Sequence, residues 1–243
     1  MIYNLIQNKI KKHQKSLLLL IDPDKFNAHR IHQMESMIKG SSVPFIVVGG
    51  SMISSPILPV IKSIKEILKL PVVLYPGSPT HITEGADGLF LLSMISGRNP
   101  DLLIGHHVVA APLLKQMNIE IIPTGYMLID GGCTTSVEYI SQTRPIPASK
   151  TDIAVATAMA GEMLGLKMIY MDAGSGAKNS ISTEMIAKVR ENISLPLLIG
   201  GGIKNTQQLN AAFNAGADMV IIGNALEKNP DLLNEMLSAT ENF

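Results

Sequence analysis

Short runs of almost continuously apolar residues recur along the chain and alternate with longer stretches of mixed polarity. A run without interspersed polar positions is typical of a strand that a parallel sheet buries on both faces. The pattern predicts strands at Ser16–Ile21, Phe45–Val48, Val72–Tyr75, Leu89–Leu92, Glu120–Pro123, Met168–Met171, Leu197–Ile199 and Met219–Ile222.

Most of these runs are followed by a stretch whose apolar residues recur at helical spacing. The predicted helices are Ile31–Ile38, Pro56–Leu68, Pro100–Met117, Ser149–Leu164, Thr183–Glu191, Thr206–Ala215 and Asn229–Ala239. Strand followed by helix, repeated about eight times within roughly 250 residues, favours an α/β fold of the (β/α)8 TIM-barrel type, with a doubly wound open sheet as the alternative. The spacing of apolar residues in Met1–Gln14 predicts an extra amphipathic helix at the N-terminus. No linker or change of composition divides residues 1–243, so we expect a single barrel domain.

One repeat lacks room for its helix. The connection between the third and fourth predicted strands, Pro76–Asp87, contains two prolines and two glycines and cannot hold a crossover helix with its two loops. The third helix is therefore predicted to be missing or replaced by a loop. Such a gap exposes apolar strand surface, which either a partner subunit covers or a long apolar ligand occupies.

Composition and charge exclude several classes of protein. Apolar residues make up 46% and charged residues 16% of the chain, enough for a sizeable core. The 20 Lys and Arg balance the 20 Asp and Glu, which disfavours a nucleic-acid binder or a polybasic membrane-surface protein. The uncharged stretch Gly40–Ile61 is broken by proline and glycine, so no transmembrane segment is expected, and no secretory signal is visible. A single cysteine, Cys133, fits a reducing compartment, and we expect a cytoplasmic protein.

Glycine-rich turns follow the sixth, seventh and eighth predicted strands. They are Ala173-Gly-Ser-Gly176, Gly200-Gly-Gly202 and Gly223-Asn224. The active site of such a barrel lies at the carboxyl ends of its strands, where its phosphate sites are also found. Turns without Cβ atoms let several backbone N–H groups point at one anion, and a helix beginning near Asn224 would add its positive end. We expect these turns to bind a phosphate monoester.

Asp22 and Ser51 stand at the ends of the first and second predicted strands. Two oxygen ligands suit Mg²⁺, which takes its remaining ligands from water and phosphate. The alternative is that Asp22 forms an Asx turn or caps the following helix. Lys25, close behind, would neutralise a second anionic group.

Asp172 ends the sixth predicted strand, directly before a glycine turn. A carboxylate there would lie close to the hydroxyls of a small phosphorylated polyol and could take a hydroxyl proton as a general base. The alternative is a structural carboxylate that caps the turn. Tyr170 would hydrogen-bond the same polyol. None of the histidines has a metal-ligand spacing, and the adjacent pair His106-His107 is interpreted as structural.

The motifs at the strand ends occur together in one known family. They are Asp22-Pro-Asp-Lys25, Val48-Gly-Gly-Ser51, Tyr75-Pro-Gly-Ser78, Ile122-Pro-Thr-Gly-Tyr126, Tyr170-Met-Asp-Ala-Gly-Ser-Gly-Ala177, Gly200-Gly-Gly-Ile203 and Gly223-Asn224. With these motifs in this order, the chain resembles the geranylgeranylglyceryl phosphate synthases, also called phosphoglycerol geranylgeranyltransferases. The longer loops are similar to those of the second group of that family.

The resemblance implies an Mg²⁺-dependent prenyltransferase of ether-lipid biosynthesis that joins a polyprenyl diphosphate, geranylgeranyl above all, to the primary hydroxyl of sn-glycerol 1-phosphate. It implies that Asp22 and Ser51 bind Mg²⁺ and that Asp172 and Lys25 are catalytic. The implied ligands of glycerol 1-phosphate are Tyr170, Met171, Asp172, Ala173, Gly174, Ser175, Gly176, Gly201, Gly202, Gly223 and Asn224. Many relatives have Glu where this chain has Asp172, so the base here has a shorter arm.

The resemblance also implies a homo-oligomer, a dimer or a hexamer, with Tyr139 as a possible interface residue, and transient contact with the membrane that receives the product. Tyr139 as an ordinary surface residue is the alternative. For the function, the alternatives are a sugar-phosphate isomerase or epimerase, an FMN-binding barrel and a phosphate-binding protein without catalysis.

Overall fold

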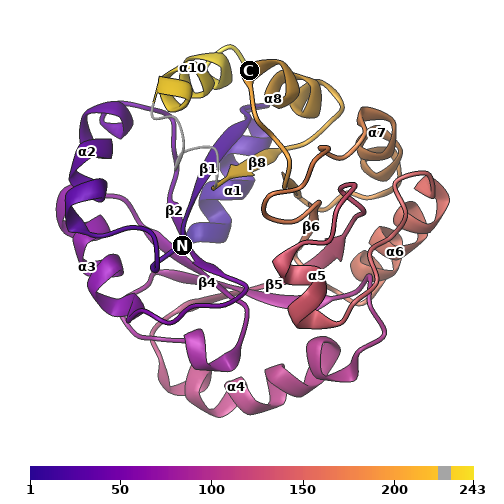
Figure 1. The fold of residues 1–243 in the computed structure, drawn as a ribbon, viewed down its shortest axis with the longest axis horizontal. Helices are drawn as coiled ribbons and strands as arrows, with labels where there is room; N and C mark the ends of the chain where they lie inside the picture. The colour runs from indigo at the N-terminus through magenta and orange to yellow at the C-terminus, as the bar shows by residue number, and fades with distance from the viewer. Residues whose placement is uncertain (224–230) are drawn as a thin grey trace.

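The computed structural model describes residues 1–223 and 231–243, and within them parallel strands form a closed barrel surrounded by helices (Figure 1). The strands are β1 (Ser16–Ile21), β2 (Ile46–Gly50), β3 (Val72–Pro76), β4 (Gly88–Met94), β5 (Glu120–Leu128), β6 (Met168–Asp172), β7 (Leu197–Gly200) and β8 (Met219–Ile222). The barrel closes where β1 pairs with β8, with Leu19 opposite Ile222. The predicted TIM-type barrel is therefore confirmed, and the open doubly wound sheet is wrong.

The helices lie around the outside of the barrel, except at its two ends. They are α1 (Ile2–Lys11), α2 (Ala28–Ile38), α3 (Ile57–Ile67), α4 (His106–Gln116), α5 (Ser136–Ser141), α6 (Thr151–Met163), α7 (Thr183–Asn192), α8 (Thr206–Asn214) and α10 (Asp231–Thr240). Side chains of Asn27, Ser182 and Asn205 accept a backbone N–H in the first turns of α2, α7 and α8. These caps mark helix starts that the sequence pattern alone placed within a few residues.

The third repeat has no crossover helix, as predicted. Between β3 and β4, residues 77–87 are all described and contain only the short 3₁₀ turn η1 (Pro79–His81). The Ser78 hydroxyl accepts the Thr80 N–H and begins that turn. The barrel wall is consequently thin on this side, next to α4.

Three parts of the chain differ from the prediction. Strand β5 continues to Leu128, whereas the pattern ended it at Pro123, because the Pro and Gly in Pro123-Thr-Gly125 are poor strand residues. Pairing with both neighbours overrides that preference: Met94 lies opposite Tyr126 on one side, and Asp172 lies opposite Leu128 on the other.

The helices differ in two places. The short helix α5 was not predicted. The single helix predicted over Pro100–Met117 is divided into a π-helical turn, η2 (Asp101–Gly105), and α4.

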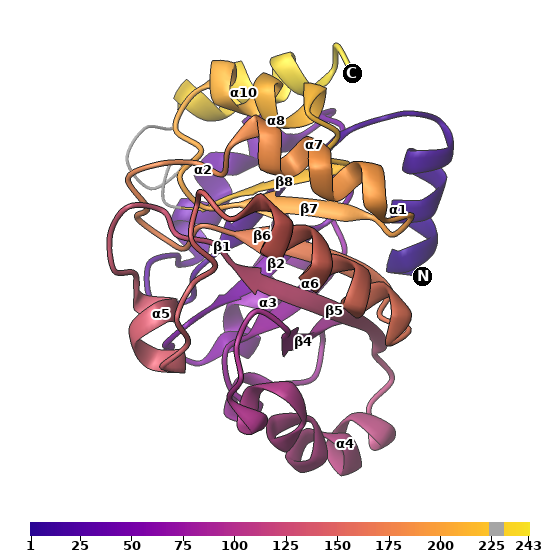
Figure 2. The same ribbon diagram turned by 90° about the vertical axis from the view of Figure 1, so that its right-hand side faces the viewer.

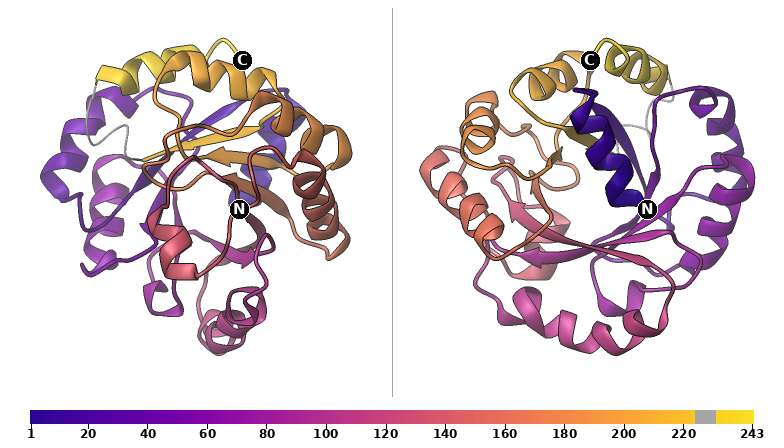
Figure 3. Two further views of the ribbon diagram at one scale, coloured as in Figure 1. Left: turned by 45° about the vertical axis from the view of Figure 1, so that its right-hand side comes forward. Right: turned by 180° about the vertical axis from the view of Figure 1, so that it is seen from behind.

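Two apolar layers hold the barrel together. Inward side chains such as Phe45, Phe90 and Leu198 fill its interior, and a second layer lies between the strands and the helices. The predicted N-terminal helix, α1, closes the end of the barrel at the amino termini of the strands (Figure 3). Its Ile2 packs into the interior layer, and the Glu120 carboxylate accepts the Ile2 and Tyr3 N–H groups.

Helices α1 and α5 lie at opposite ends of the barrel (Figure 2). Because α1 seals one end, the accessible end is that of α5, where the strands have their carboxyl termini. In the described part of the chain, every helix is too short or too polar to cross a membrane.

Candidate active site

A polar cavity of about 660 Å³ opens at the carboxyl ends of the strands. Its lining includes many of the residues singled out in the sequence: Asp22, Lys25, Ser51, Tyr170, Asp172, Gly174, Ser175, Gly176, Gly201, Gly202 and Gly223. The fold thus brings together residues from five different strand ends, those of β1, β2, β6, β7 and β8. Asn224, also predicted as a ligand, lies outside the described residues.

Two predicted ligands face away from this cavity. Met171 and Ala173 are buried in the outer apolar layer, between the strands and the helices. Side chains alternate across a strand, so the neighbours of the inward Tyr170 and Asp172 necessarily point outward. The Ala173 N–H is also in use, since it donates to the Gly200 carbonyl at 3.0 Å.

The glycine turns after β6 and β7 pack against each other at distances that exclude side chains. Gly174, Gly176, Gly201 and Gly202 all have positive φ, between 70° and 87°. A Cβ on Gly201 would lie 2.6 Å from the Gly174 nitrogen, and one on Gly202 would lie 2.4 Å from the Asn179 carbonyl oxygen. Within the described residues, the N–H groups of Ser175, Gly176 and Gly202 donate to no protein group. This arrangement fits the predicted phosphate cradle.

Asp172 is held by hydrogen bonds at both carboxylate oxygens. The Gly174 N–H donates to Oδ1 at 2.8 Å, and the Tyr126 hydroxyl donates to Oδ2 at 2.7 Å. Burial raises the pKa of Asp172, and hydrogen bonds from Tyr126, the Gly174 amide and Tyr170 partly oppose that rise. A carboxylate with a raised pKa is a stronger base, so the turn-capping role and the role of general base are both compatible with this geometry.

Three tyrosines surround this carboxylate from inside the barrel. The rings of Tyr126 and Tyr170 meet edge to face with centroids 5.2 Å apart, and Tyr75 lies 5.8 Å from Tyr170. Burial and the charge of Asp172 raise the pKa of all three phenols, so their hydroxyls stay protonated at neutral pH. Tyr170 lines the polar cavity and hydrogen-bonds Asp172, and its predicted hydrogen bond to the polyol stays a prediction.

Asp22 makes the Asx turn that was one of its two interpretations, since its Oδ1 accepts the Asp24 N–H at 3.0 Å. Its Oδ2 lies 3.3 Å from the Lys25 ammonium and faces the end of β2. Among the described residues, no group of three or more His, Cys, Asp or Glu could hold a metal. The Asp22 carboxylate and the Ser51 hydroxyl still form a sparse set of hard oxygens at the cavity, which fits Mg²⁺ and does not fit zinc.

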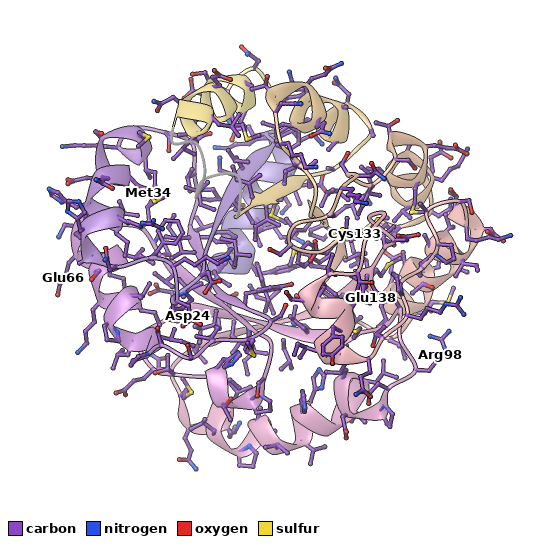
Figure 4. The ribbon with its side chains drawn as sticks, viewed as in Figure 1. Asp24, Met34, Glu66, Arg98, Cys133 and Glu138 are labelled. Atoms are coloured by element: carbon purple, nitrogen blue, oxygen red, sulfur yellow. The ribbon has the colours of Figure 1, made fainter. Side chains whose placement is uncertain are left out.

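Asp24 fixes the relative position of the first two loops. Its carboxylate accepts hydrogen bonds from the N–H groups of Ser54 and Ser55 and from the Ser54 hydroxyl. These bonds lower the pKa of Asp24 to about 2. Asp24 lies on the opposite side of this end of the barrel from Glu138 (Figure 4). It acts at a distance from the cradle, by keeping Asp22 next to Ser51.

A second, mainly apolar cavity of about 250 Å³ lies where the third helix is missing. Its lining includes Leu91, Leu92, Leu102 and Ala110, and it shares Ser51 and Tyr75 with the polar cavity. The gap was predicted either to be covered by a partner subunit or to bind a long apolar ligand. A cavity with a mainly apolar lining at this place supports the second interpretation. The groove joins the polar cavity at the ends of β2 and β3, whereas the glycine cradle lies at the ends of β6 and β7.

The sequence analysis missed several residues that line these cavities. His106 and His107 line the groove although they were interpreted as structural, and His107 Nε2 lies 3.0 Å from the Ser93 hydroxyl. The α5 segment contributes Val137 and Ile140 to both cavities. The loop that connects β5 and α6, and contains α5, has no apolar pattern typical of a strand or helix. The sequence pattern therefore did not indicate that this loop lies at the mouth of the polar cavity. Cys133 in that loop lies against the turn after β6, with Sγ 3.7 Å from the Gly176 carbonyl oxygen (Figure 4).

Residues 8–241 match the PcrB family. The chain belongs to the PcrB family. A relative from Chitinophaga pinensis named geranylgeranylglyceryl phosphate synthase is 47% identical over 98% of this chain and 95% of its own length. One of the same name from Methanosphaera stadtmanae is 37% identical over 99% of this chain and 98% of its own. The resemblance stated from the strand-end motifs is confirmed.

Solved structures agree with this family membership. The (S)-3-O-geranylgeranylglyceryl phosphate synthase from Thermoplasma acidophilum, in complex with its substrate sn-glycerol-1-phosphate, superposes with a TM-score of 0.91 at 27% identity, covering 99% of this chain and 98% of that one. An N-acetylmannosamine-6-phosphate 2-epimerase from Clostridium perfringens superposes with a TM-score of 0.56 at 12% identity over 94% of this chain and 91% of its own. This second likeness shows only the shared barrel fold.

Proposed function

We propose that this PcrB-family protein transfers a polyprenyl group, such as geranylgeranyl, from its diphosphate to the primary hydroxyl of sn-glycerol 1-phosphate. The observation that carries the proposal is the junction of two cavities at Ser51 and Tyr75: a polar one with a glycine cradle and a base, and an apolar one in the gap of the barrel wall. A sugar-phosphate isomerase needs only the first cavity. Relatives of the same name, and one bound to glycerol 1-phosphate, support this choice.

The phosphate of glycerol 1-phosphate would be held by the free N–H groups of the turns after β6 and β7. Bound there, the substrate extends its hydroxyls toward Asp172, which lines the same cavity. The cradle selects a dianionic phosphate without a lysine or arginine, because the donors are fixed dipoles in a partly buried site.

The reaction forms one bond and breaks one. The hydroxyl oxygen of glycerol 1-phosphate bonds to C1 of the allylic group, and the bond between C1 and the diphosphate oxygen breaks with its electron pair leaving on diphosphate. Asp172 takes the hydroxyl proton, and its raised pKa favours that step. Lys25, beside Asp22, stabilises the negative charge of the leaving diphosphate.

Asp22 and Ser51 would hold Mg²⁺ at the boundary of the two cavities. The ion, when bound, supplies positive charge that stabilises the diphosphate as a leaving group. The Asp24 hydrogen bonds keep these two ligands in reach of each other.

The test is incubation of the full chain with radiolabelled sn-glycerol 1-phosphate, Mg²⁺ and allylic diphosphates of increasing length. We expect an organic-extractable ether phosphate, less of it with sn-glycerol 3-phosphate, and none in EDTA. Absence of product with every diphosphate would overturn the proposal. A yellow protein with flavin absorbance would instead favour the FMN-binding alternative.

A further inference from the structure

Tyr126 lies at the site, but neither the motifs nor the proposed mechanism assigns it a role. It lies on the part of β5 that the sequence pattern did not predict, and only 2% of its surface is exposed. Its ring lines the apolar groove, and its hydroxyl donates to Asp172 in the polar cavity. Tyr126 thus connects the groove that it lines to a carboxylate that lines the polar cavity.

The position of this hydroxyl follows from the register of two strands. Leu128 on β5 lies opposite Asp172 on β6, and Tyr126 lies opposite Tyr170. The Tyr126 side chain therefore starts one inward position below Asp172 and reaches it through the length of the phenol. The edge-to-face contact with Tyr170 and burial on all sides leave the ring little freedom to turn.

The carboxylate needs this second anchor. Without the Tyr126 hydroxyl, the carboxylate would keep the Gly174 N–H on Oδ1 and the weaker hydrogen bond from Tyr170. Oδ2 would then be held less firmly, so the direction in which the base accepts a proton would vary. The Tyr126 hydroxyl, 2.7 Å from Oδ2, removes that freedom. A base that is misplaced by about 1 Å loses roughly 100-fold in rate, so such an anchor affects catalysis without contacting substrate.

We propose that Tyr126 is a positioning residue that fixes the orientation in which Asp172 receives the proton of the attacking hydroxyl. The inference rests on the proposed function and extends it to a residue that acts through the base. The Tyr126 hydroxyl only donates a hydrogen bond to the Asp172 carboxylate, and it keeps its proton throughout the reaction.

The first experiment compares Tyr126→Phe with Tyr3→Phe. Each change removes one phenol hydroxyl, but the Tyr3 hydroxyl donates to the Lys167 carbonyl and accepts from the Gln7 amide near the sealed end of the barrel. For Y126F we expect kcat to fall about 10-fold or more, with the KM for glycerol 1-phosphate within a factor of two. The acid limb of the pH profile should move up by about one unit, because the carboxylate loses a donor that favours its ionised form. Y3F should behave as the wild type.

The second experiment asks whether Tyr126 acts through Asp172. Adding Y126F to Asp172→Asn should lower the residual rate no further, because the base that Tyr126 positions is already gone. In protein labelled with ¹³C at aspartate Cγ, the Asp172 signal, assigned by its loss in D172N, should titrate about one unit higher in Y126F.

The outcomes separate this inference from the proposed function. A wild type that makes no ether product overturns the function, while the Asp172 titration still tests the anchor. An unchanged titration and pH profile in Y126F, or a raised KM with unchanged kcat, would overturn the inference. If Y126F does not fold, 3-fluorotyrosine placed at position 126 keeps the ring, and as a stronger donor it should move the acid limb down; no movement would again overturn it.

Discussion

At the scale of single residues, the central group of this site is the Asp172 carboxylate, whose burial lowers the stability of the folded protein when it is charged. Asp172 is buried, and its pKa is raised from the ordinary 3.8 because burial disfavours the charge. For a raised pKa, the folded state binds the proton more tightly than the unfolded state. The associated stability is present below about pH 4 and is lost as the pH rises through the folded value. At neutral pH the charged Asp172 therefore lowers the stability of the fold, and the proposed reaction would need this group as its base.

Asp172→Asn should separate stability from activity. Asparagine preserves the shape and removes the charge, so we expect a melting temperature at pH 7 that is higher by about 2–4 °C, the shift of ~1 kcal/mol for a chain of this size. The difference from the wild type should shrink toward pH 4. Turnover should fall about 100-fold or more. Calorimetry of both proteins at several pH values checks the stability prediction. It would be contradicted if the gain in stability of D172N over the wild type were smaller at pH 7 than at pH 4.

At the scale of elements, the site depends on loops that touch only because they lack side chains. The turn after β7 approaches the turn after β6 so closely that a Cβ on Gly201 would meet the Gly174 nitrogen and the Asp172 Oδ1 within 2.7 Å. Closeness and positive φ are separate demands on this glycine, and each can be tested on its own.

Gly201→Ala and Gly165→Ala form a matched pair for that test. Both glycines have positive φ, +75° and +81°, but Gly165 has no atom within 4 Å of an added Cβ. Each variant should lose about 1–2 kcal/mol of stability from backbone strain. Only G201A should weaken glycerol 1-phosphate binding, by about 10-fold or more, as titration calorimetry would measure. Equal binding by the two variants would argue against the cradle.

The groove makes a corresponding prediction for α4. Ala110 is buried and lines the groove, whereas Val109 beside it is 69% exposed. Ala110→Phe should shorten the groove and lower kcat/KM for a C20 diphosphate about 10-fold more than for a C10 diphosphate, since buried apolar area is lost for the longer chain. Val109→Phe is the control on the outer face. If A110F leaves the preference for chain length unchanged, the tail does not bind here.

At the scale of the whole molecule, the sealed end of the barrel and the candidate site lie apart. Helix α1 and Glu120 seal one end, the polar cavity opens at the other end, and the apolar groove extends into the gap in the wall between β4 and α4. On α5, Tyr139 lies at the edge of the polar cavity, and 77% of its side chain is exposed. An aromatic side chain this exposed fits an interface residue, as the family resemblance implied.

The assembly of the protein is therefore testable through Tyr139. Light scattering of the wild type should give a mass that is a multiple of the 26.1 kDa chain, and Tyr139→Ala should lower that multiple. Because the side chain is exposed in the single chain, the variant should fold normally. A wild type that is monomeric at micromolar concentration would exclude the predicted oligomer.

The amino-acid sequence by itself determined the order of strands and helices, the missing third helix and the glycine turns. These follow from local patterns: uninterrupted apolar runs, helical spacing, and proline and glycine at places where neither helix nor side chain fits. Local pattern also explains the error at β5, where Pro123 and Gly125 suggested an end that pairing with β4 and β6 overrides.

Only the tertiary structure decided which of these residues act together. Strand register placed the Tyr126 hydroxyl next to Asp172. The alternation of side chains along β6 turned Met171 and Ala173 away from the cavity. Residues of α5 line the mouth of the cavity, although no periodic pattern in the sequence marks that segment. Distances between residues far apart in sequence depend on how the barrel closes, and closure is a property of all the strands at once.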